Sequence, residues 1–203
     1  MTGKSKALRA CALGVALATL TAAAWAHPGH IGHLHGEALA TGLMHPLTGF
    51  DHLFAMLAVG IWAALTHDNV RDALWSPISF AALLFIGALA GISGLTLPLM
   101  EPLIMASLLV LGLLVAARLR LPQWAGATLV GFFAFFHGLA HGSELPGSTE
   151  TAWSFIAGFM ITTALLHVAG MLFGFQIKRR DRWIARVAGG GIAAYGAALL
   201  LGA

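Results

Sequence analysis

The sequence contains little thiol and little charge, and each shortage excludes a class of chemistry. Its one cysteine, Cys11, follows Arg9-Ala10, where a lipoprotein signal would need small or apolar residues. The chain beyond residue 26 has no thiol, which excludes disulfides and thiolate metal sites there. No segment resembles a nucleotide-binding loop, so energy for transport or catalysis must come from ion gradients, the membrane potential or a partner protein.

Charged residues make up only 9% of the 203 residues, whereas hydrophobic residues make up 59%. Soluble domains carry roughly 25% charged residues, so this composition is typical of a chain that folds in a lipid bilayer. The polar side chains include ten histidines. Imidazole and carboxylate groups are therefore the main ligands that the sequence offers to a metal ion.

Residues 1–26 have the pattern of a secretory signal peptide. Three basic residues precede an apolar run over 10–21, and a small-x-small cleavage site follows at 24–26. The alternative is an uncleaved first transmembrane helix, but the run of about 12 residues is shorter than the ~20 that a span requires. Cleavage after Ala26 would leave eight basic and eight acidic residues, so the charge balance indicates no nucleic-acid partner.

Residues 27–203 are predicted to form a single all-α membrane domain. A backbone in lipid must satisfy its own hydrogen bonds, so apolar stretches of span length are predicted to be helices. Six such stretches predict a six-helix transmembrane bundle: about 49–66, 77–96, 99–117, 123–141, 152–175 and 184–202. Glycine within them favours close helix packing. Gly91-Ile92-Ser93-Gly94 is similar to the serine motif of rhomboid proteases, but we interpret it as a packing site.

All basic residues between the predicted spans fall on one side of the bundle. By the positive-inside rule that side faces the cytoplasm, so the mature amino terminus and the carboxyl terminus are predicted to be periplasmic. A secretory signal delivers the amino terminus to the same compartment, which favours the bacterial cytoplasmic membrane as the location. The basic residues are Arg71, Arg118, Arg120, Lys178, Arg179, Arg180, Arg182 and Arg186.

With this topology, eight of the ten histidines face the outer side. Four of them crowd the amino-terminal tract, at His27, His30, His33 and His35. A His-rich tract of this kind collects metal loosely. Cleavage after Ala26 would also make His27 the first residue, and its free amine and ring nitrogen are then an alternative chelating pair.

The segment 45–52 reads His-Pro-x-x-Gly-x-Asp-His. Its proline and glycine predict a broken helix near residues 45–52, and broken membrane helices expose carbonyls and helix ends that bind ions. Ionisable groups are costly in lipid and commonly mark ion pathways, so we interpret His45, Asp51 and His52 as metal-site residues. Buried polar contact between helices is the alternative.

The span 123–141 carries a second polar group at its outer end. His137 and His141 are four residues apart and Glu144 follows in phase, so all three lie within about 40° of one helix face. His52 and His137 both lie about 21 to 23 Å above the inner boundary by the helical rise, so one site can include both. We therefore predict His137, His141 and Glu144 as metal ligands, with structural polar contacts again the alternative.

Two further residues are candidates for secondary roles. His167 lies deeper, about 16 Å above the inner boundary, where it suits a relay step or a hydrogen bond to a neighbouring helix. Glu101 heads the span 99–117 on the outer side. Together with Glu37, Glu144 and Glu150 it makes the outer mouth acidic, which concentrates cations.

The segment at 45–52, followed by Leu53 and Gly60, and the Phe-Phe-His-Gly-x-Ala-His-Gly-x-Glu segment at 135–144 resemble the HupE/UreJ family. This resemblance covers essentially all of the mature chain. It implies a nickel or cobalt permease with a cleaved signal and six helices, and it implies hydrogenase or urease maturation proteins as partners. The matching positions are His45, Asp51, His52, His137, His141 and Glu144.

The sequence thus predicts a secondary transporter that takes up Ni²⁺ or Co²⁺, with Zn²⁺ also suited to imidazole ligands. A membrane-embedded zinc hydrolase is an alternative, because one aspartate and three histidines also suit a metal-bound water. A metal sensor or chaperone subunit without transport is a third interpretation. Transport requires the polar path to continue toward the cytoplasm, and His167 favours it.

We expect His137→Ala and His141→Ala each to weaken metal binding by more than about tenfold, because each removes a direct imidazole ligand. Calorimetric titration of the purified protein with Ni²⁺ or Co²⁺ measures this, and circular dichroism checks that the helices are kept. An unchanged affinity in either folded variant would show that its imidazole is not a ligand.

Overall fold

The structure is a computed structural model that describes residues 35–145, 149–179 and 182–202. These residues belong to one compact unit, Ile31–Ala203. They are helical apart from short connections and contain no strand, which confirms the all-α prediction for the described part of the chain. The predicted signal peptide at 1–26 and the predicted collecting residues His27, His30 and His33 lie outside the described residues.

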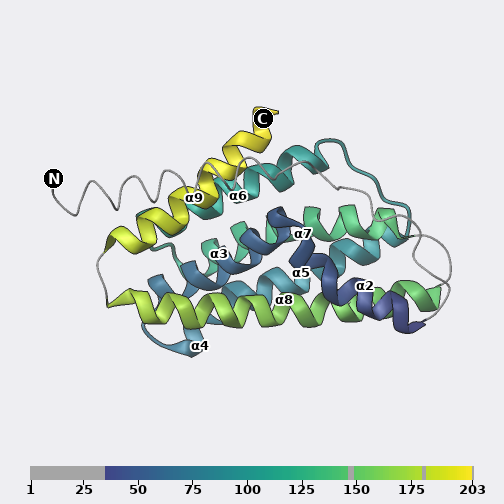
Figure 1. The fold of residues 1–203 in the computed structure, drawn as a ribbon, viewed down its shortest axis with the longest axis horizontal. Helices are drawn as coiled ribbons and strands as arrows, with labels where there is room; N and C mark the ends of the chain where they lie inside the picture. Colours follow the sequence, from purple (N-terminus) through teal and green to yellow (C-terminus); the bar gives the residue numbers. More distant parts are fainter. Residues whose placement is uncertain (1–34, 146–148, 180–181, 203) are drawn as a thin grey trace, which may run out of the picture. The chain divides into compact units, whose positions relative to one another are not determined.

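Helices follow one another along the described chain (Figure 1). They are α2 (His35–Thr48), α3 (Phe50–Thr66), α4 (Val70–Ala73), α5 (Trp75–Ile92), α6 (Met100–Ala117), α7 (Gln123–Glu144), α8 (Thr149–Lys178) and α9 (Arg182–Leu200).

Each of the six predicted spans coincides with one of these helices. The bounds of α3, α6, α7 and α9 lie close to the predicted ones, whereas α5 ends earlier and α8 extends further at both ends. The main difference is α2, which was not predicted because two glycines and Pro46 interrupt its sequence. α2 packs against α8, and this contact explains why the segment is helical, since tertiary packing supplies most of the stability of a helix.

Four helical segments are long and apolar enough to cross a membrane: Val70–Ile92, Met100–Ala117, Glu150–Lys178 and Arg182–Leu200. The bent pair α2 and α3 passes the same test together as one broken span. α7 is not among them, because its polar residues lower its hydropathy. The helices therefore indicate a membrane protein, while the crossing of all six predicted spans remains a prediction.

The predicted break in the first membrane segment is present and lies at Gly49. The axes of the helical segments on either side differ by 74°. Gly49 has an extended backbone (φ −90°, ψ 110°), and Pro46 lies inside the preceding helix, where it has no N–H to donate. The bend therefore separates a short helix that carries His45 from the longer helix that carries His52.

Glycines let the helices approach one another closely along their main interfaces. On α7, a Cβ atom added to Gly138 or Gly142 would lie within 3.0 Å of a carbonyl oxygen of α5. Gly42 of α2 lies equally close to the backbone of α8 at Phe155, and Gly60 of α3 to that of α8 at His167. In lipid the hydrophobic effect does not drive helices together, so close backbone packing of this kind stabilises their association instead.

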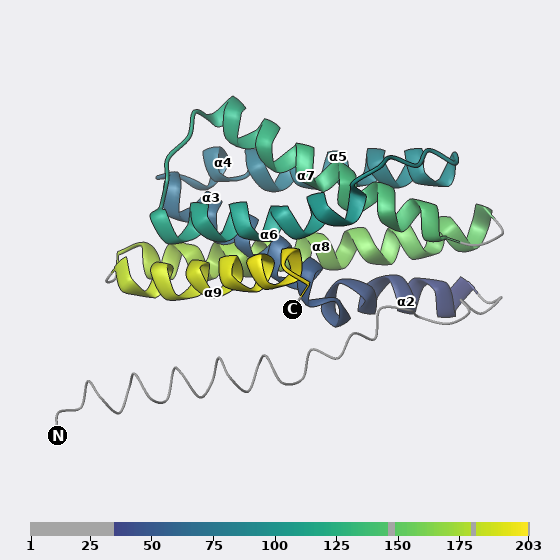
Figure 2. The same ribbon diagram turned by 90° about the horizontal axis from the view of Figure 1, so that it is seen from above.

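α8 supports the helices on both sides of the break. It packs against α2 along one part of its length and against α3 along another, as Figures 1 and 2 show. α5 pairs with α7, and α6 pairs with α9, while α3 also contacts α6. The core between them includes Met56, Trp62, Phe80 and Leu108, all fully or almost fully buried.

Basic side chains gather where α6 and α8 end and α9 begins. Asp68 accepts a hydrogen bond of 2.9 Å from Lys178 Nζ and one of 3.3 Å from Arg120. The hydrogen bond from Lys178, with its charge, holds the pKa of Asp68 below its usual value. This link is therefore present at neutral pH and is lost as the pH falls through that lowered pKa.

The interface between α6 and α9 offers a test of glycine packing with two adjacent residues. A Cβ atom at Gly189 would lie within 3.0 Å of the α6 backbone at Gly112 and Ala116, whereas one at Gly190 would meet nothing within 4 Å. We expect Gly189→Leu to lower the free energy of unfolding by about 1–3 kcal/mol or more, because the backbone cannot yield. Thermal unfolding in detergent measures this.

Gly190→Leu is the matched control and is expected to unfold near the wild-type temperature, since both variants add the same apolar side chain to the same helix. Equal unfolding temperatures for the two variants would refute close packing at Gly189.

Candidate metal centre

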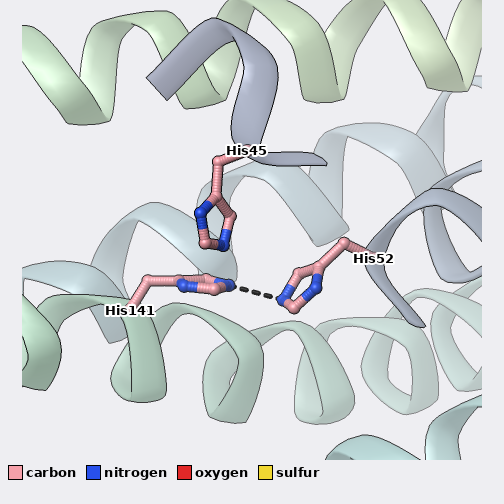
Figure 3. Close-up of side chains that lie close together, drawn as sticks. All are labelled: His45, His52 and His141. Carbon is pink, nitrogen blue, oxygen red and sulfur yellow. Dashed lines mark hydrogen bonds between the residues drawn. The ribbon is translucent and has the colours of Figure 1, made fainter. Parts of the chain in front are cut away.

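Three histidines from three helices converge beside the break in the chain. His45 lies in the last turn of α2, His52 in the first turn of α3 and His141 in the last turn of α7. One ring nitrogen from each lies within 4.8 Å of the other two. Figure 3 shows the three rings pointing toward a common point. His52 and His141 are buried, and His45 is partly buried.

The bend at Gly49 brings His45 and His52 together. The Gly49 N–H donates to His45 O at 3.2 Å, which closes the last turn of α2 before the chain turns. A Cβ atom at Gly49 would lie 2.9 Å from both Asp51 Oδ1 and His52 Nδ1. Only glycine leaves room for this pair, so the residue that permits the bend also admits the polar side chains beside it.

Asp51 orients the imidazole of His52 and lies behind it. The His52 Nδ1–H donates to Asp51 Oδ1 at 2.7 Å, and the His52 backbone N–H donates to the same oxygen at 2.9 Å. Because Nδ1 carries the proton, the lone pair of His52 is on Nε2. A carboxylate behind a histidine in this way is the usual outer support of a metal-binding imidazole, so Asp51 is a candidate positioning residue.

The lone pair of His52 faces His141 directly. The two Nε2 atoms are 2.5 Å apart, so at most one of them carries a proton. Two imidazoles bound to one ion at about 2.0–2.1 Å have their nitrogens roughly 3 Å apart or more, so these two rings would need to separate slightly to hold an ion. His52 and His141 are therefore two candidate ligands, and His45 is the third.

His137 lies one turn before His141 and adds a fourth imidazole. Its ring centroid is 5.1 Å from that of His52. The Ser107 hydroxyl donates to Ile104 O at 2.6 Å, so its oxygen accepts from His137 Nε2 at 3.0 Å. The proton is then on Nε2, and the buried Nδ1 lone pair of His137 has no hydrogen-bond partner among the described residues. Such a buried acceptor requires an explanation, and an ion or water supplies one.

Phe80 contacts the rings of both His137 and His167. Phe80 has its ring centroid 6.1 Å from that of His137 and 5.0 Å from that of His167. His167 is buried, and its Nε2 atom has no hydrogen-bond partner. A hydrogen bond from this nitrogen to a neighbouring helix, the alternative interpretation, is thus not formed within the described chain.

Two phenylalanines of α8 line the cluster, and neither was predicted as a site residue. Phe159 stands 4.8 Å from the His141 ring and Phe155 stands 5.5 Å from the His45 ring, centroid to centroid. Both are buried, so they shield the imidazoles from lipid and solvent and strengthen electrostatic interactions within the site. In the sequence, nothing distinguishes these two phenylalanines from the other apolar residues of a membrane helix. Ser107 was not predicted for the same reason.

The structure does not bring every predicted site residue into this cluster. Glu144 ends α7 as an exposed side chain, and Glu101 is exposed in the first turn of α6. His35 is the first residue of α2. The converging ligand atoms therefore come from His45, His52 and His141, with Asp51 behind His52 and His137 adjacent.

Comparisons with known proteins agree with the two motifs. A family model described as HupE / UreJ protein matches residues 15–199. The chain is 41% identical over 188 residues to Protein HupE of Rhizobium leguminosarum bv. viciae, which covers 92% of this chain and 95% of that protein. No solved structure is significantly similar to the present chain.

The role of Asp51 predicts a graded effect of substitution. We expect Asp51→Asn to lower metal affinity by about 10- to 100-fold, because the amide no longer fixes His52 with its lone pair on Nε2. His52→Ala, which removes the imidazole itself, should lower it further. Titration calorimetry with Ni²⁺ or Co²⁺ measures both, and wild-type affinity in folded Asp51→Asn would refute the positioning role.

Proposed function

The chain belongs to the HupE/UreJ family, and we propose that it is a permease that takes up Ni²⁺ or Co²⁺ through the site of His45, His52 and His141. The observation that carries this proposal is the convergence of three imidazole nitrogens within 4.8 Å of one another at a broken membrane helix. The family is associated with nickel and cobalt, and the metal is the cargo.

The ligand set suits these ions. Imidazole nitrogens bind Ni²⁺, Co²⁺, Cu²⁺ and Zn²⁺, and the site contains neither a thiolate nor a directly facing carboxylate, which would favour softer or harder cations. Three imidazoles leave coordination positions for water or for His137 Nδ1. A partly open site of this kind binds an ion and also releases it, as transport requires.

The position of the site in the chain supports entry from the membrane surface. Backbone at a helix break is tolerated in a membrane where it lines a cavity or a site, and such breaks coordinate transported ions in other transporter folds. Partly buried His45 and the 30% exposed side chain of Asp51 mark the side from which an ion arrives. We assign this side to the periplasm and the basic end to the cytoplasm, by the positive-inside rule.

Beyond the three histidines, polar groups continue into the helices. His137 lies next to His52, and Phe80 contacts both His137 and His167, each of which has a buried nitrogen with no hydrogen-bond partner in the described chain. This succession favours passage over hydrolysis, since a hydrolase needs a base beside a metal-bound water and Asp51 is instead bonded to His52. Ion entry is favoured by about 4.6 kcal/mol per 100 mV of inside-negative potential for a doubly charged ion.

The cytoplasmic recipients of the metal would be hydrogenase or urease maturation proteins. This follows from the family association, and the proposal places the chain in the cytoplasmic membrane of a bacterium, after removal of its signal peptide. A sensor or chaperone role would require metal binding at the same histidines but no net movement of metal.

Uptake of radiolabelled Ni²⁺ and Co²⁺ into proteoliposomes tests this function, with an inside-negative potential imposed. We expect uptake by the wild type above empty vesicles, and uptake by the His52→Ala, His137→Ala double variant at the level of empty vesicles, because one of the three converging imidazoles and the adjacent imidazole of His137 are lost. His67→Ala, which removes an imidazole beyond the other end of α3, is the control and should retain uptake.

Absence of wild-type uptake above empty vesicles would refute the permease function. If metal binding persisted in that case, the sensor or chaperone interpretation would replace it.

A further inference from the structure

A second polar pocket lies at the other end of α3 from the histidines. It has a volume of about 300 Å³. Leu65, which lines it, is separated from His52 along α3 by about 20 Å of helical rise. Among the described residues that line it, five of eight are cationic and none is acidic. These residues are Leu65, Ala116, Ala117, Arg118, Arg120, Lys178, Arg182 and Arg186.

Arg118 is built into the wall of this pocket rather than extended into solvent. It ends α6 in the left-handed conformation (φ 49°), which is rare for residues other than glycine. Its terminal nitrogens donate to the carbonyl oxygens of Ile177 and Lys178, at 3.2 and 3.3 Å, and so cap α8. Its Nε atom is buried without a partner. This N–H is a donor for which the described chain supplies no acceptor.

The described residues balance the positive charge of the pocket only in part. Asp68 pairs with Lys178 and Arg120, and no ion pair within the described chain joins Arg182 or Arg186. These two arginines are four residues apart on α9, so they lie on the same face of the helix and repel each other. An anion between them would remove this repulsion and accept several charge-assisted hydrogen bonds.

Three tryptophans indicate the depth of the pocket. Trp75, Trp124 and Trp183 lie at the starts of α5, α7 and α9, and they are 53%, 74% and 58% exposed. Tryptophan prefers the boundary between the hydrocarbon and the headgroups of a bilayer. Trp183 directly follows Arg182, so the pocket lies at the level of the lipid headgroups.

We propose that this pocket binds the phosphate group of an anionic phospholipid. The guanidinium groups match phosphate oxygens, and basic pockets between membrane helices recognise anionic headgroups. The acyl chains would extend along the exposed apolar surfaces of α6 and α9, which include Leu113 and Val187. This site is independent of the metal centre and does not rest on the proposed transport function.

Native mass spectrometry of the detergent-solubilised protein tests the proposal with phosphatidylglycerol, with phosphatidylcholine of the same acyl chains, and with inorganic phosphate. We expect the wild type to retain phosphatidylglycerol preferentially. An Arg182→Gln, Arg186→Gln variant should bind it about tenfold or more weakly, because charge-assisted hydrogen bonds are lost. An Arg71→Gln, Arg179→Gln variant removes two exposed charges from the same end outside the pocket, and it should stay within about twofold of wild type.

Equal losses in the two double variants would overturn the proposal in favour of a general charge effect. Equal retention of phosphatidylglycerol and phosphatidylcholine would also overturn the proposal. Displacement of the lipid by millimolar inorganic phosphate would overturn it too, because the ligand of the pocket would then be a soluble anion. If the pocket variant is not recovered folded, Arg186→Gln alone is compared with Arg179→Gln under the same criteria.

Discussion

The structure depends on direct contact between helix backbones at glycine, and the histidine site is built from the same contacts. In α7 each of the two histidines is followed by a glycine that packs against α5. Successive residues in a helix point about 100° apart, so the glycine faces α5 while the histidine faces the site. Gly42 plays the corresponding part in α2, where it packs on α8 one turn before His45. A larger residue at any of these glycines would move a ligand.

Two hydrogen bonds decide which ring nitrogen of His52 and of His137 keeps a free lone pair. Asp51 accepts a hydrogen bond from His52 Nδ1–H, and the Ser107 hydroxyl accepts one from His137 Nε2–H. The free lone pairs are therefore Nε2 in one case and Nδ1 in the other. Because the rings are buried among phenylalanines, they cannot reorient to solvent, and the packing restrains the directions of these lone pairs.

The two ends of the helices have opposite electrostatic character. One end carries imidazoles, exposed glutamates and a partly exposed aspartate, which attract cations, and the other carries five cationic side chains around one pocket. Asp68 balances part of the positive charge of the pocket, and the phosphate that we infer would balance more. The histidine cluster and the basic pocket are separate sites at ends of opposite electrostatic character.

Helix positions were predictable because a helix that crosses the hydrocarbon layer needs a known length and an apolar composition. Four of the six predicted spans coincide with helices apolar enough to cross a membrane, and a fifth coincides with α3, the second helix of the bent pair. The break was predictable because proline and glycine interrupt a helix at or near their own positions in the sequence. α2 was not, since two glycines and Pro46 interrupt its sequence, and the helix it packs on, α8, begins more than a hundred residues further along the chain.

For the site, sequence by itself determined which residue types are present and which share a helix face, including His137 with His141. Only the tertiary structure decided that His45 joins His52 and His141, that Asp51 lies behind His52, and that Glu144 is exposed away from the cluster. The reason is geometric. A helical repeat relates residues within one helix, whereas the 74° bend and the glycine contacts decide which faces of different helices meet.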